Sequence, residues 1–242
     1  MSPQYHTIII GAGIAGASIA HALAQKSQKV LVVEKIAIAS GGSGSAGAFV
    51  SPKIGKISPL HTLTNQAFNY AKDFYLTNTK EHFHQTGVVR IPKDAEDEKK
   101  FFDSYEQFNQ NRYITLTKER LKTMGIASDF DSFYFDEAGD CDAIAVCEAL
   151  LEGIDVVIED IKKIYQKDNL WCVGEHKSPN LILATGYESD LVDLDYMGIS
   201  GTWGSRGDFY SNYPLSISMH QSISIGANQN GVIKIGDRKS DV

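Results

Sequence analysis

Three glycines near the N-terminus, Gly11, Gly13 and Gly16, have the G-x-G-x-x-G spacing of a dinucleotide-binding turn. They follow the β-branched run 7–10 and open an alanine-rich segment over 15–26. The first glycine allows a tight turn, the second lets the backbone approach a diphosphate, and the third lets the helix pack closely. The start of a helix also favours an anion. The sequence therefore predicts a diphosphate site at Gly11, Ala12, Gly13, Ile14, Ala15 and Gly16.

An acidic residue, Glu34, ends the second β-branched run, 30–33, about 20 residues after the glycines. A carboxylate at this place accepts hydrogen bonds from the ribose hydroxyls of the adenosine. We expect Glu34 to have this role, with Lys35 beside it. A glycine turn without a ligand is disfavoured, because strand, helix and acid all occur at the required spacing.

A glycine- and serine-rich segment over 39–48 follows this unit. Its composition alone is typical of a flexible linker, but the buried-looking sequence around it favours a functional loop. The first βαβ unit cannot separate FAD from NAD, since both contain the ADP half. A loop of small residues beside the glycine turn could give N–H and hydroxyl groups to a long cofactor, which favours FAD. The candidates in this loop are Gly42, Ser43, Gly44, Ser45, Gly47 and Ala48.

The elements that would position these residues indicate an α/β fold, α+β overall. The short apolar runs 7–10, 30–33 and 181–184 are typical of strands buried in a parallel sheet. We predict a Rossmann-type FAD-binding domain, interleaved with an antiparallel-sheet substrate domain. The predicted FAD-binding domain comprises residues 1–80 and 136–195, and the predicted substrate domain comprises 81–135 and 196–242.

Within the predicted substrate domain, strands are expected over 87–91 and 133–135, and a charged, exposed helix over 94–108. The tail alternates like a set of strands and has a hairpin turn signal at 228–231. Thr117 and Asp142 are expected to cap helices. A further amphipathic helix is predicted by apolar residues at steps of three and four, namely Leu60, Leu63, Ala67, Ala71 and Phe74. The aromatic residues on or beside that stripe, Tyr70, Phe74 and Tyr75, are expected in the core rather than in a substrate cage.

Composition and charge exclude several classes of protein. The 242 residues carry a formal net charge of −7, which argues against a general attraction to nucleic acid or anionic membranes. Apolar runs are only strand-length, and the N-terminus lacks a basic region, so we expect no membrane span and no signal peptide. Three cysteines without C-x-x-C spacing predict reduced thiols in a cytoplasmic protein. His82 and His84 lack a third ligand in the sequence, so no metal is expected.

The chain resembles the D-amino-acid oxidase/glycine oxidase-like superfamily of FAD-dependent oxidoreductases. The resemblance covers nearly the whole chain. It rests on 8–16 with Glu34-Lys35, on the loop Gly42–Lys53, on Thr86–Arg90, on Ala138–Asp142, on Leu183–Gly186 and on Ser205–Gly207. Within the superfamily, the sequence is most similar to the FAD oxidase domain of the tRNA 5-methylaminomethyl-2-thiouridine biosynthesis enzymes.

The resemblance implies FAD as cofactor and oxidation of a C–N bond, with the hydride passing to the flavin and hydrolysis of the imine. It adds further cofactor-binding candidates, Ile161, Ala184, Thr185 and Gly186. The substrate implied is an amine or amino-acid-like group, and the closest likeness points to the carboxymethylaminomethyl group of a tRNA wobble uridine. The acidic charge favours a small-molecule glycine or D-amino-acid oxidase or dehydrogenase instead.

A substrate carboxylate would be bound best by a cation, ideally a bidentate arginine. The candidates are Arg206, Arg90 and Lys53, of which Arg206 and Lys53 are our predicted catalytic residues. A structural ion pair at Arg206 and a solvated loop lysine at Lys53 are the alternatives.

The chain departs from the family pattern at its end. The family has a further glycine-rich segment near its C-terminus that closes over the flavin, whereas this sequence stops at Asp241-Val242. We likewise expect the methyltransferase domain that precedes the flavin domain in the tRNA enzymes to be missing. We therefore expect the C-terminal part of the family fold to be missing, which keeps open a non-catalytic dinucleotide-binding module.

Overall fold

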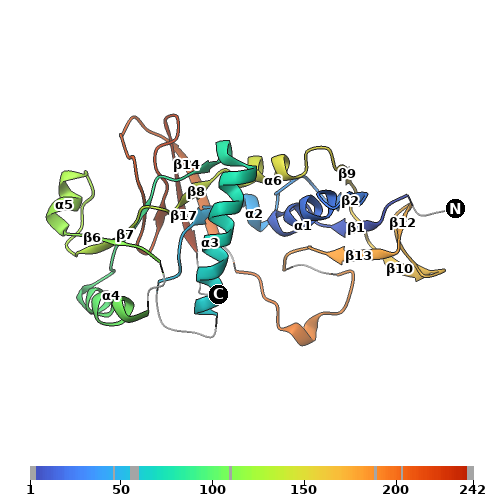
Figure 1. Cartoon of the computed structure of the whole chain (residues 1–242), viewed down its shortest axis with the longest axis horizontal. Coiled ribbons are helices and arrows are strands. Elements are labelled where there is room, and N and C mark those ends of the chain that lie inside the picture. Colours follow the sequence, from blue (N-terminus) through green and yellow to red (C-terminus); the bar gives the residue numbers. More distant parts are fainter. Residues whose placement is uncertain are drawn as a thin grey trace. The chain divides into compact units, whose positions relative to one another are not determined.

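The computed structural model describes residues 4–45, 47–54, 60–108, 111–187, 190–202 and 204–238 (Figure 1). The chain divides into two compact units, each made of two separate stretches. Unit 1 comprises residues 1–46 and 142–203, and unit 2 comprises residues 47–141 and 204–242.

A four-stranded parallel sheet forms the centre of unit 1. Its order is β13 (Asn180–Leu183), β1 (Thr7–Ile10), β2 (Val30–Glu34) and β9 (Asp155–Ile158). Strands β1 and β2 are buried along nearly their whole length, as their β-branched composition predicts for a parallel sheet. One face of the sheet packs a core around Ile8, Ile10 and Leu31.

Two helices of unit 1 pack against each other through small or apolar side chains. Helix α1 (Ile14–Ala24) buries Gly16, Ala17 and Ala20, and α6 (Ala143–Leu150) buries a face that includes Cys147. The Asp142 carboxylate caps α6 by accepting from the Ala145 N–H at 3.2 Å, as predicted. The remaining elements are an antiparallel meander and two short helices. They are β10 (Ile164–Lys167), β11 (Leu170–Val173), β12 (His176–Ser178), α2 (Gly42–Ser45) and the 3₁₀ turn η2 (Asp195–Met197).

Unit 2 is built on a seven-stranded sheet. Its order is β14 (Gly204–Tyr210), β17 (Val232–Arg238), β16 (Ser224–Ile225), β15 (Ser218–His220), β5 (Val88–Arg90), β7 (Ser132–Phe135) and β6 (Ile114–Leu116). The predicted antiparallel sheet is in fact mixed, because β5 and β15 run parallel. The predicted turn at 228–231 joins β16 to β17, with positive φ at Asn230 and Gly231.

The two faces of this sheet bury different side chains. On what we call the α3 face, Val88, Phe133 and Phe135 pack with Phe68 of α3 (His61–Asn78) and Phe101 of α4 (Ala95–Phe108). The opposite face carries a core of aliphatic residues, among them Leu121 of α5 (Lys118–Thr123). Thr117 caps α5, as predicted, by accepting from the Arg120 N–H at 3.2 Å. A second, smaller sheet of unit 2 has the order β3 (Phe49–Val50), β8 (Gly139–Cys141) and β4 (Phe83–His84), and η1 (Lys80–His82) leads into β4.

Helix α3 forms where it was predicted, but it does not bury the predicted stripe. Leu60 and Leu63 are 61% and 59% exposed, and Tyr70 is 72% exposed, so the expectation that Tyr70 belongs to the core was wrong. The buried face instead carries His61, Asn65 and Phe68. Asn65 can be buried because its Oδ1 accepts from the Lys53 N–H at 3.1 Å and from Asn111 Nδ2 at 2.8 Å, while its Nδ2 donates to the His61 carbonyl at 3.1 Å.

Helix α4 is also less exposed than its charges predict. Phe101 is 7% exposed, and its ring lies 5.5 Å from that of Phe133. The charged residues of its first turn dominate the composition of α4, and for this reason the buried aromatic face was not predicted from the sequence.

The boundaries of the two units differ from the predicted 80/81, 135/136 and 195/196. They fall at 46/47, 141/142 and 203/204. Residues 47–80 belong with unit 2 because β3 pairs with β8, with Phe49 opposite Asp140, and because Phe68 packs in the unit 2 core. Whether the two units divide into cofactor-binding and substrate-binding domains stays a prediction.

Among the described residues, no helix combines the length and the apolar character that crossing a membrane requires. The three cysteines are free thiols, and all are buried.

Candidate dinucleotide-binding site

The glycine turn of unit 1 has the close packing that its motif requires. Gly11 has φ of +109°, and a Cβ there would collide with the Ala184 carbonyl oxygen. A Cβ at Gly16 would collide with the Gly11 carbonyl oxygen, so the start of α1 can lie against the turn only with glycine at this position. At Gly13 a Cβ would lie 3.0 Å from the Ser43 hydroxyl. Any other residue at Gly11 or Gly16 would therefore move the backbone that lines the site.

The Glu34 carboxylate is fixed beside this turn. Its Oε2 accepts from the Ala12 N–H at 2.8 Å, and its Oε1 accepts from the Ile36 N–H at 3.1 Å. The side chain is thus held at the carboxyl end of β2, next to the turn after β1, where an adenosine ribose is bound in dinucleotide folds. Lys35 is exposed beside it.

The glycine- and serine-rich segment returns to the same turn. The Ala39 N–H donates to the Ala12 carbonyl at 3.1 Å, and the Ile14 N–H donates to Ser43 Oγ at 2.9 Å. Gly13, the residue before α1, has no side chain to cap the helix, so Ser43 supplies the acceptor from 29 positions away. The predicted functional loop contains the short helix α2, and the Gly44 N–H donates to the Ala39 carbonyl at 2.9 Å.

These residues fit the diphosphate of a dinucleotide. The hydroxyl oxygen of Ser43 marks a place where an acceptor meets an amide at the start of α1, and a phosphate oxygen is an acceptor of the same kind. A serine hydroxyl can rotate and donate to that oxygen. The carboxylate of Glu34 supplies an acceptor of the kind that the ribose hydroxyls need.

The end of β13 completes this edge of the parallel sheet. The Ala184 N–H donates to the Ile10 carbonyl at 2.8 Å, and Thr185 and the positive-φ Gly186 follow. The predicted residues Ala184, Thr185 and Gly186 therefore lie beside the glycine turn. Ile161 is half-buried and packs against the core around Ile8 and Leu31.

Other predicted cofactor residues belong to unit 2. Gly47 and Ala48 lead into β3, and the Ala48 carbonyl accepts from the Cys141 N–H at 3.0 Å. Ala46, within the same predicted loop, lies outside the described residues.

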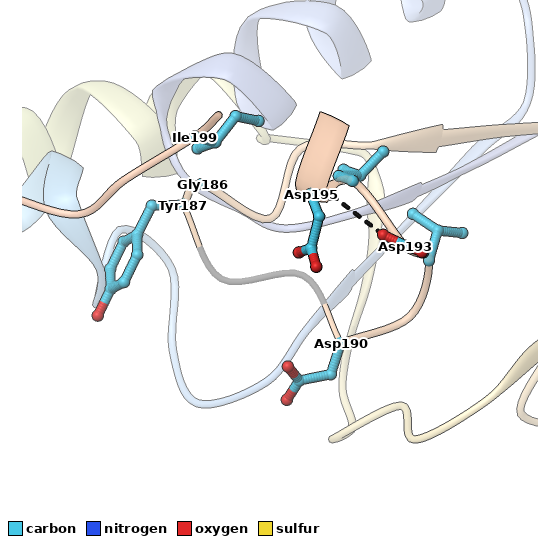
Figure 2. Close-up of a pocket in the computed structure, with 8 residues that line it drawn as sticks. Gly186, Tyr187, Asp190, Asp193, Asp195 and Ile199 are labelled. Atoms are coloured by element: carbon cyan, nitrogen blue, oxygen red, sulfur yellow. Dashed lines mark hydrogen bonds between the residues drawn. The ribbon is translucent and has the colours of Figure 1, made fainter. Parts of the chain in front are cut away.

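A cavity of about 420 Å³ begins at Gly186 and is lined by the segment that follows β13 (Figure 2). Three carboxylates line it, from Asp190, Asp193 and Asp195, with the Asp195 N–H donating to Asp193 Oδ1 at 3.1 Å. Like charges disfavour a diphosphate there, so this cavity does not extend the diphosphate site.

The predicted catalytic residues Arg206 and Lys53 lie in unit 2. Arg206 Nε contacts Asp208 Oδ1 at 3.1 Å, which is the ion pair that was the alternative to a substrate role. Lys53 is half-buried, and its N–H is bonded to Asn65.

The strand register places Arg206 in one row with Arg90 on the α3 face. Arg90 lies opposite His220, His220 opposite Ser224, Ser224 opposite Gly236, and Gly236 opposite Arg206. Directly opposite residues point to the same face of a sheet, so two guanidinium groups flank an imidazole, a hydroxyl and a glycine.

Sequence reasoning missed His220. Its Nδ1 lies 2.8 Å from Ser224 Oγ, and burial together with the neighbouring Arg90 and Lys93 lowers the pKa of His220 to about 4. The imidazole is therefore neutral near pH 7. The alternation of polar and apolar residues in 217–225 was the signal that could have placed it on the polar face.

A second missed cluster surrounds Asp140, which is 6% exposed. Its carboxylate contacts His84 Nδ1 at 3.2 Å and accepts from Ser218 Oγ at 2.8 Å. His84 is thus engaged with Asp140, while His82 lies in η1 rather than in an extended segment. Over the described ranges, no three histidine, cysteine or acidic side chains gather as metal ligands would.

Comparison with known proteins identifies the family. The model of the FAD dependent oxidoreductase family, DAO, matches residues 6–202. Two curated relatives are tRNA 5-methylaminomethyl-2-thiouridine biosynthesis bifunctional proteins MnmC. That of Maricaulis maris (strain MCS10) is 34% identical over 94 residues, which are 38% of this chain and 16% of the relative. That of Marinobacter nauticus (strain ATCC 700491 / DSM 11845 / VT8) is 23% identical over 195 residues, 75% of this chain and 31% of the relative.

Solved structures agree on the fold. Glycine oxidase from Bacillus cereus ATCC 14579 superposes with a TM-score of 0.77 at 22% identity, over 98% of this chain and 72% of that one. L-proline dehydrogenase from P. horikoshii superposes with a TM-score of 0.74 at 17% identity, over 100% and 73%.

Proposed function

Because the chain belongs to the DAO family of FAD-dependent oxidoreductases, we propose that it oxidises a C–N bond of an amine or amino-acid-like group. The first substrate to test is the carboxymethylaminomethyl group of a tRNA wobble uridine, in line with the names of the curated relatives. The chain spans less than a third of those relatives, so this activity is proposed for the chain itself.

The observation that supports the proposal best is the joint placement of Ala12, Glu34 and Ser43. One carboxylate and one hydroxyl, from segments far apart in sequence, both bond amides of the same turn, at 2.8 and 2.9 Å. That arrangement offers ribose acceptors and a diphosphate cradle within one turn of chain.

Bound FAD would supply the two-electron acceptor for the oxidation. The residues of the chain have the simpler tasks of binding and orientation. Gly11 and Gly16 keep the turn against β13 and α1, Ser43 meets the diphosphate, and Glu34 meets the ribose. No strong base is required if the amine arrives neutral.

For the substrate, the proposal places a carboxylate near Arg90 on the α3 face of the seven-stranded sheet. Arg90 is chosen for this role because it lies directly opposite His220 in the strand register, and a guanidinium group can bind a carboxylate in a bidentate manner. His220 lies opposite Arg90 and is neutral near pH 7, so it can accept a hydrogen bond from the N–H of a neutral substrate amine. Lys53 stays a prediction as a second cation.

The cofactor part is tested by the flavin content of purified Glu34→Ala and Glu34→Gln variants. We expect a yellow wild-type protein, and an FAD affinity lowered about tenfold in both variants through the lost charged hydrogen bonds. Exposed Glu96→Gln in α4 is the control. A colourless wild type that binds NADH would overturn the proposal.

The substrate part is tested by anaerobic bleaching of the flavin absorbance. Wobble-uridine nucleosides, tRNA, glycine and D-amino acids are added in turn. Bleaching by the tRNA or its nucleoside supports the tRNA reaction, and bleaching by the amino acids alone supports a small-molecule oxidase, which the net charge of −7 favours. A protein that holds FAD but is bleached by none of them is a binding module.

The role of Arg90 is tested separately. Arg90→Gln should raise KM at least tenfold for amines that carry a carboxylate and leave KM unchanged for amines without one. Arg112→Gln, at an exposed ion pair with Asp136, is the matched control. Equal effects of Arg90→Gln on both substrate classes would exclude a carboxylate contact.

A further inference from the structure

Strand β14 forms an open edge of the seven-stranded sheet. Within the described ranges it pairs with β17 alone, over seven residues from Gly204 to Tyr210. Most of these residues are exposed, and Phe209 and Tyr210 are 52% and 94% exposed. A long edge strand with exposed aromatic rings is a surface on which another strand can add.

The direction of the backbone groups along β14 follows from one hydrogen bond. The Ser211 N–H donates to the Gly231 carbonyl at 2.9 Å, so residue 211 faces β17. N–H and C=O groups alternate in direction along an antiparallel strand. The groups of Gly204, Arg206, Asp208 and Tyr210 therefore point away from β17, toward the open edge.

The charged residues of β14 favour one register for its pairing with β14 of a second copy. Two copies related by a two-fold axis run antiparallel, and outward-facing residues must lie opposite outward-facing residues. The axis can then pass through Arg206, Gly207 or Asp208. The first choice sets arginine opposite arginine and the third sets aspartate opposite aspartate, and like charges directly opposite are destabilising. An axis at Gly207 sets Arg206 opposite Asp208 twice.

We propose that β14 is a dimerisation edge, which pairs with β14 of a second copy of this chain about a two-fold axis at Gly207. In this register all seven residues of one strand lie opposite the seven of the other. The existing contact between Arg206 Nε and Asp208 Oδ1 becomes part of a four-charge network across the axis. The inference does not rest on the proposed function.

The neighbouring side chains suit the same register. Gly204 lies opposite Tyr210 of the second copy, so the most exposed aromatic ring of the strand covers a residue without a side chain. Ser205 lies opposite Phe209 of the second copy on the other face. The interface is small, so the dimer should dissociate on dilution.

The test uses two charge reversals and their mixture. In Asp208→Lys, two cations lie opposite each other, and in Arg206→Asp, two anions do. We expect each variant alone to dimerise at least about tenfold more weakly than wild type in sedimentation analysis. Mixed together, they should form a heterodimer, because every opposed pair is then of opposite sign. A larger tag on one variant identifies the mixed species.

Formation of the heterodimer in the mixture would also show that both variants are folded. Asp103→Lys, the same charge change at an exposed position of α4, should dimerise like wild type. The proposal is overturned by a wild type that stays monomeric at all concentrations, by Asp208→Lys dimerising like wild type, or by a mixture that forms no heterodimer.

Discussion

The two units of the molecule present their candidate sites in different ways. In unit 1 the site is made mainly of backbone, at a turn whose glycines pack against carbonyl oxygens of Gly11 and Ala184. In unit 2 it is made of side chains on a sheet face, brought into one row by strands more than a hundred residues apart, as Arg90 and His220 are. A site of the first kind depends on local conformation, and a site of the second kind depends on register.

The comparison is tested most strongly at Gly16. Gly16→Ala should nearly abolish FAD binding and lower the thermal stability sharply, because the added methyl meets the Gly11 carbonyl oxygen and the backbone cannot move aside. Flavin-to-protein absorbance ratios and thermal melts measure both effects.

Gly226→Ala in unit 2 is the matched control, since a Cβ there would make only ordinary van der Waals contacts, the nearest at 3.5 Å. If Gly16→Ala retained its flavin, the backbone description of the unit 1 site would be wrong.

In unit 2 the side-chain packing below the row should dominate stability. Phe133 is fully buried, with ring centroids of Tyr113 and Phe102 at 4.4 and 4.9 Å. Phe133→Ala should cost about 3–5 kcal/mol in the free energy of unfolding, measured in urea. Tyr70→Ala, at a 72% exposed ring, should change it by less than about 0.5 kcal/mol. Equal costs would mean that the α3 face is not packed as described.

His220, in the row of polar residues on the α3 face, should also make the stability of unit 2 fall at acidic pH. The pKa of His220 is lowered from 6.5 to about 4, so the unfolded chain takes up a proton at a higher pH than the folded chain. Above pH 6.5 both states are neutral there, and stability falls as pH drops from 6.5 toward 4. His220→Gln should flatten this part of the pH dependence of the melting temperature. An unchanged slope in the variant would show that the imidazole is not buried beside Arg90 and Lys93.

The last prediction concerns unit 1, where burial should slow the reaction of the Cys147 thiol with reagents. Burial, and then the neighbouring Glu148, raise the pKa of the Cys147 thiol to about 11. Native protein at pH 8 should therefore react with a thiol reagent far more slowly at this residue than unfolded protein does. Mass spectrometry of alkylated peptides measures it, and rapid native labelling of Cys147 would show that α6 opens away from α1.

The features that could be predicted from the sequence are those set by short sequence motifs. The caps at Thr117 and Asp142 and the turn at 228–231 depend on neighbours within a few residues, and the structure has them as predicted. The glycine spacing and Glu34 could be found because they follow a known motif, and the structure brings Glu34 to the Ala12 N–H, while their roles toward a cofactor stay a prediction. The buried face of α3 was wrong because Asn65 is satisfied by Lys53 and Asn111, and neither partner can be inferred from the helix itself.

The row across the seven-stranded sheet was not foreseen for a related reason. His220 joins Arg90 only because β15 pairs with β5, which no local pattern specifies. The boundaries of the two compact units differ from the predicted domain boundaries for the same reason, since β3 pairs with β8, about ninety residues later in the sequence.

The parallel pairing of β5 with β15 has a consequence for the nascent chain. During synthesis β5 emerges from the ribosome with β7 soon after it, yet its other neighbour comes more than a hundred residues later, once the second stretch of unit 1 has been made. Until then β5 has no partner strand on one side, and Val88 and Val89 lie in an incomplete sheet. Folding of unit 2 must therefore await translation of the strands in 204–238, more than a hundred residues after β5.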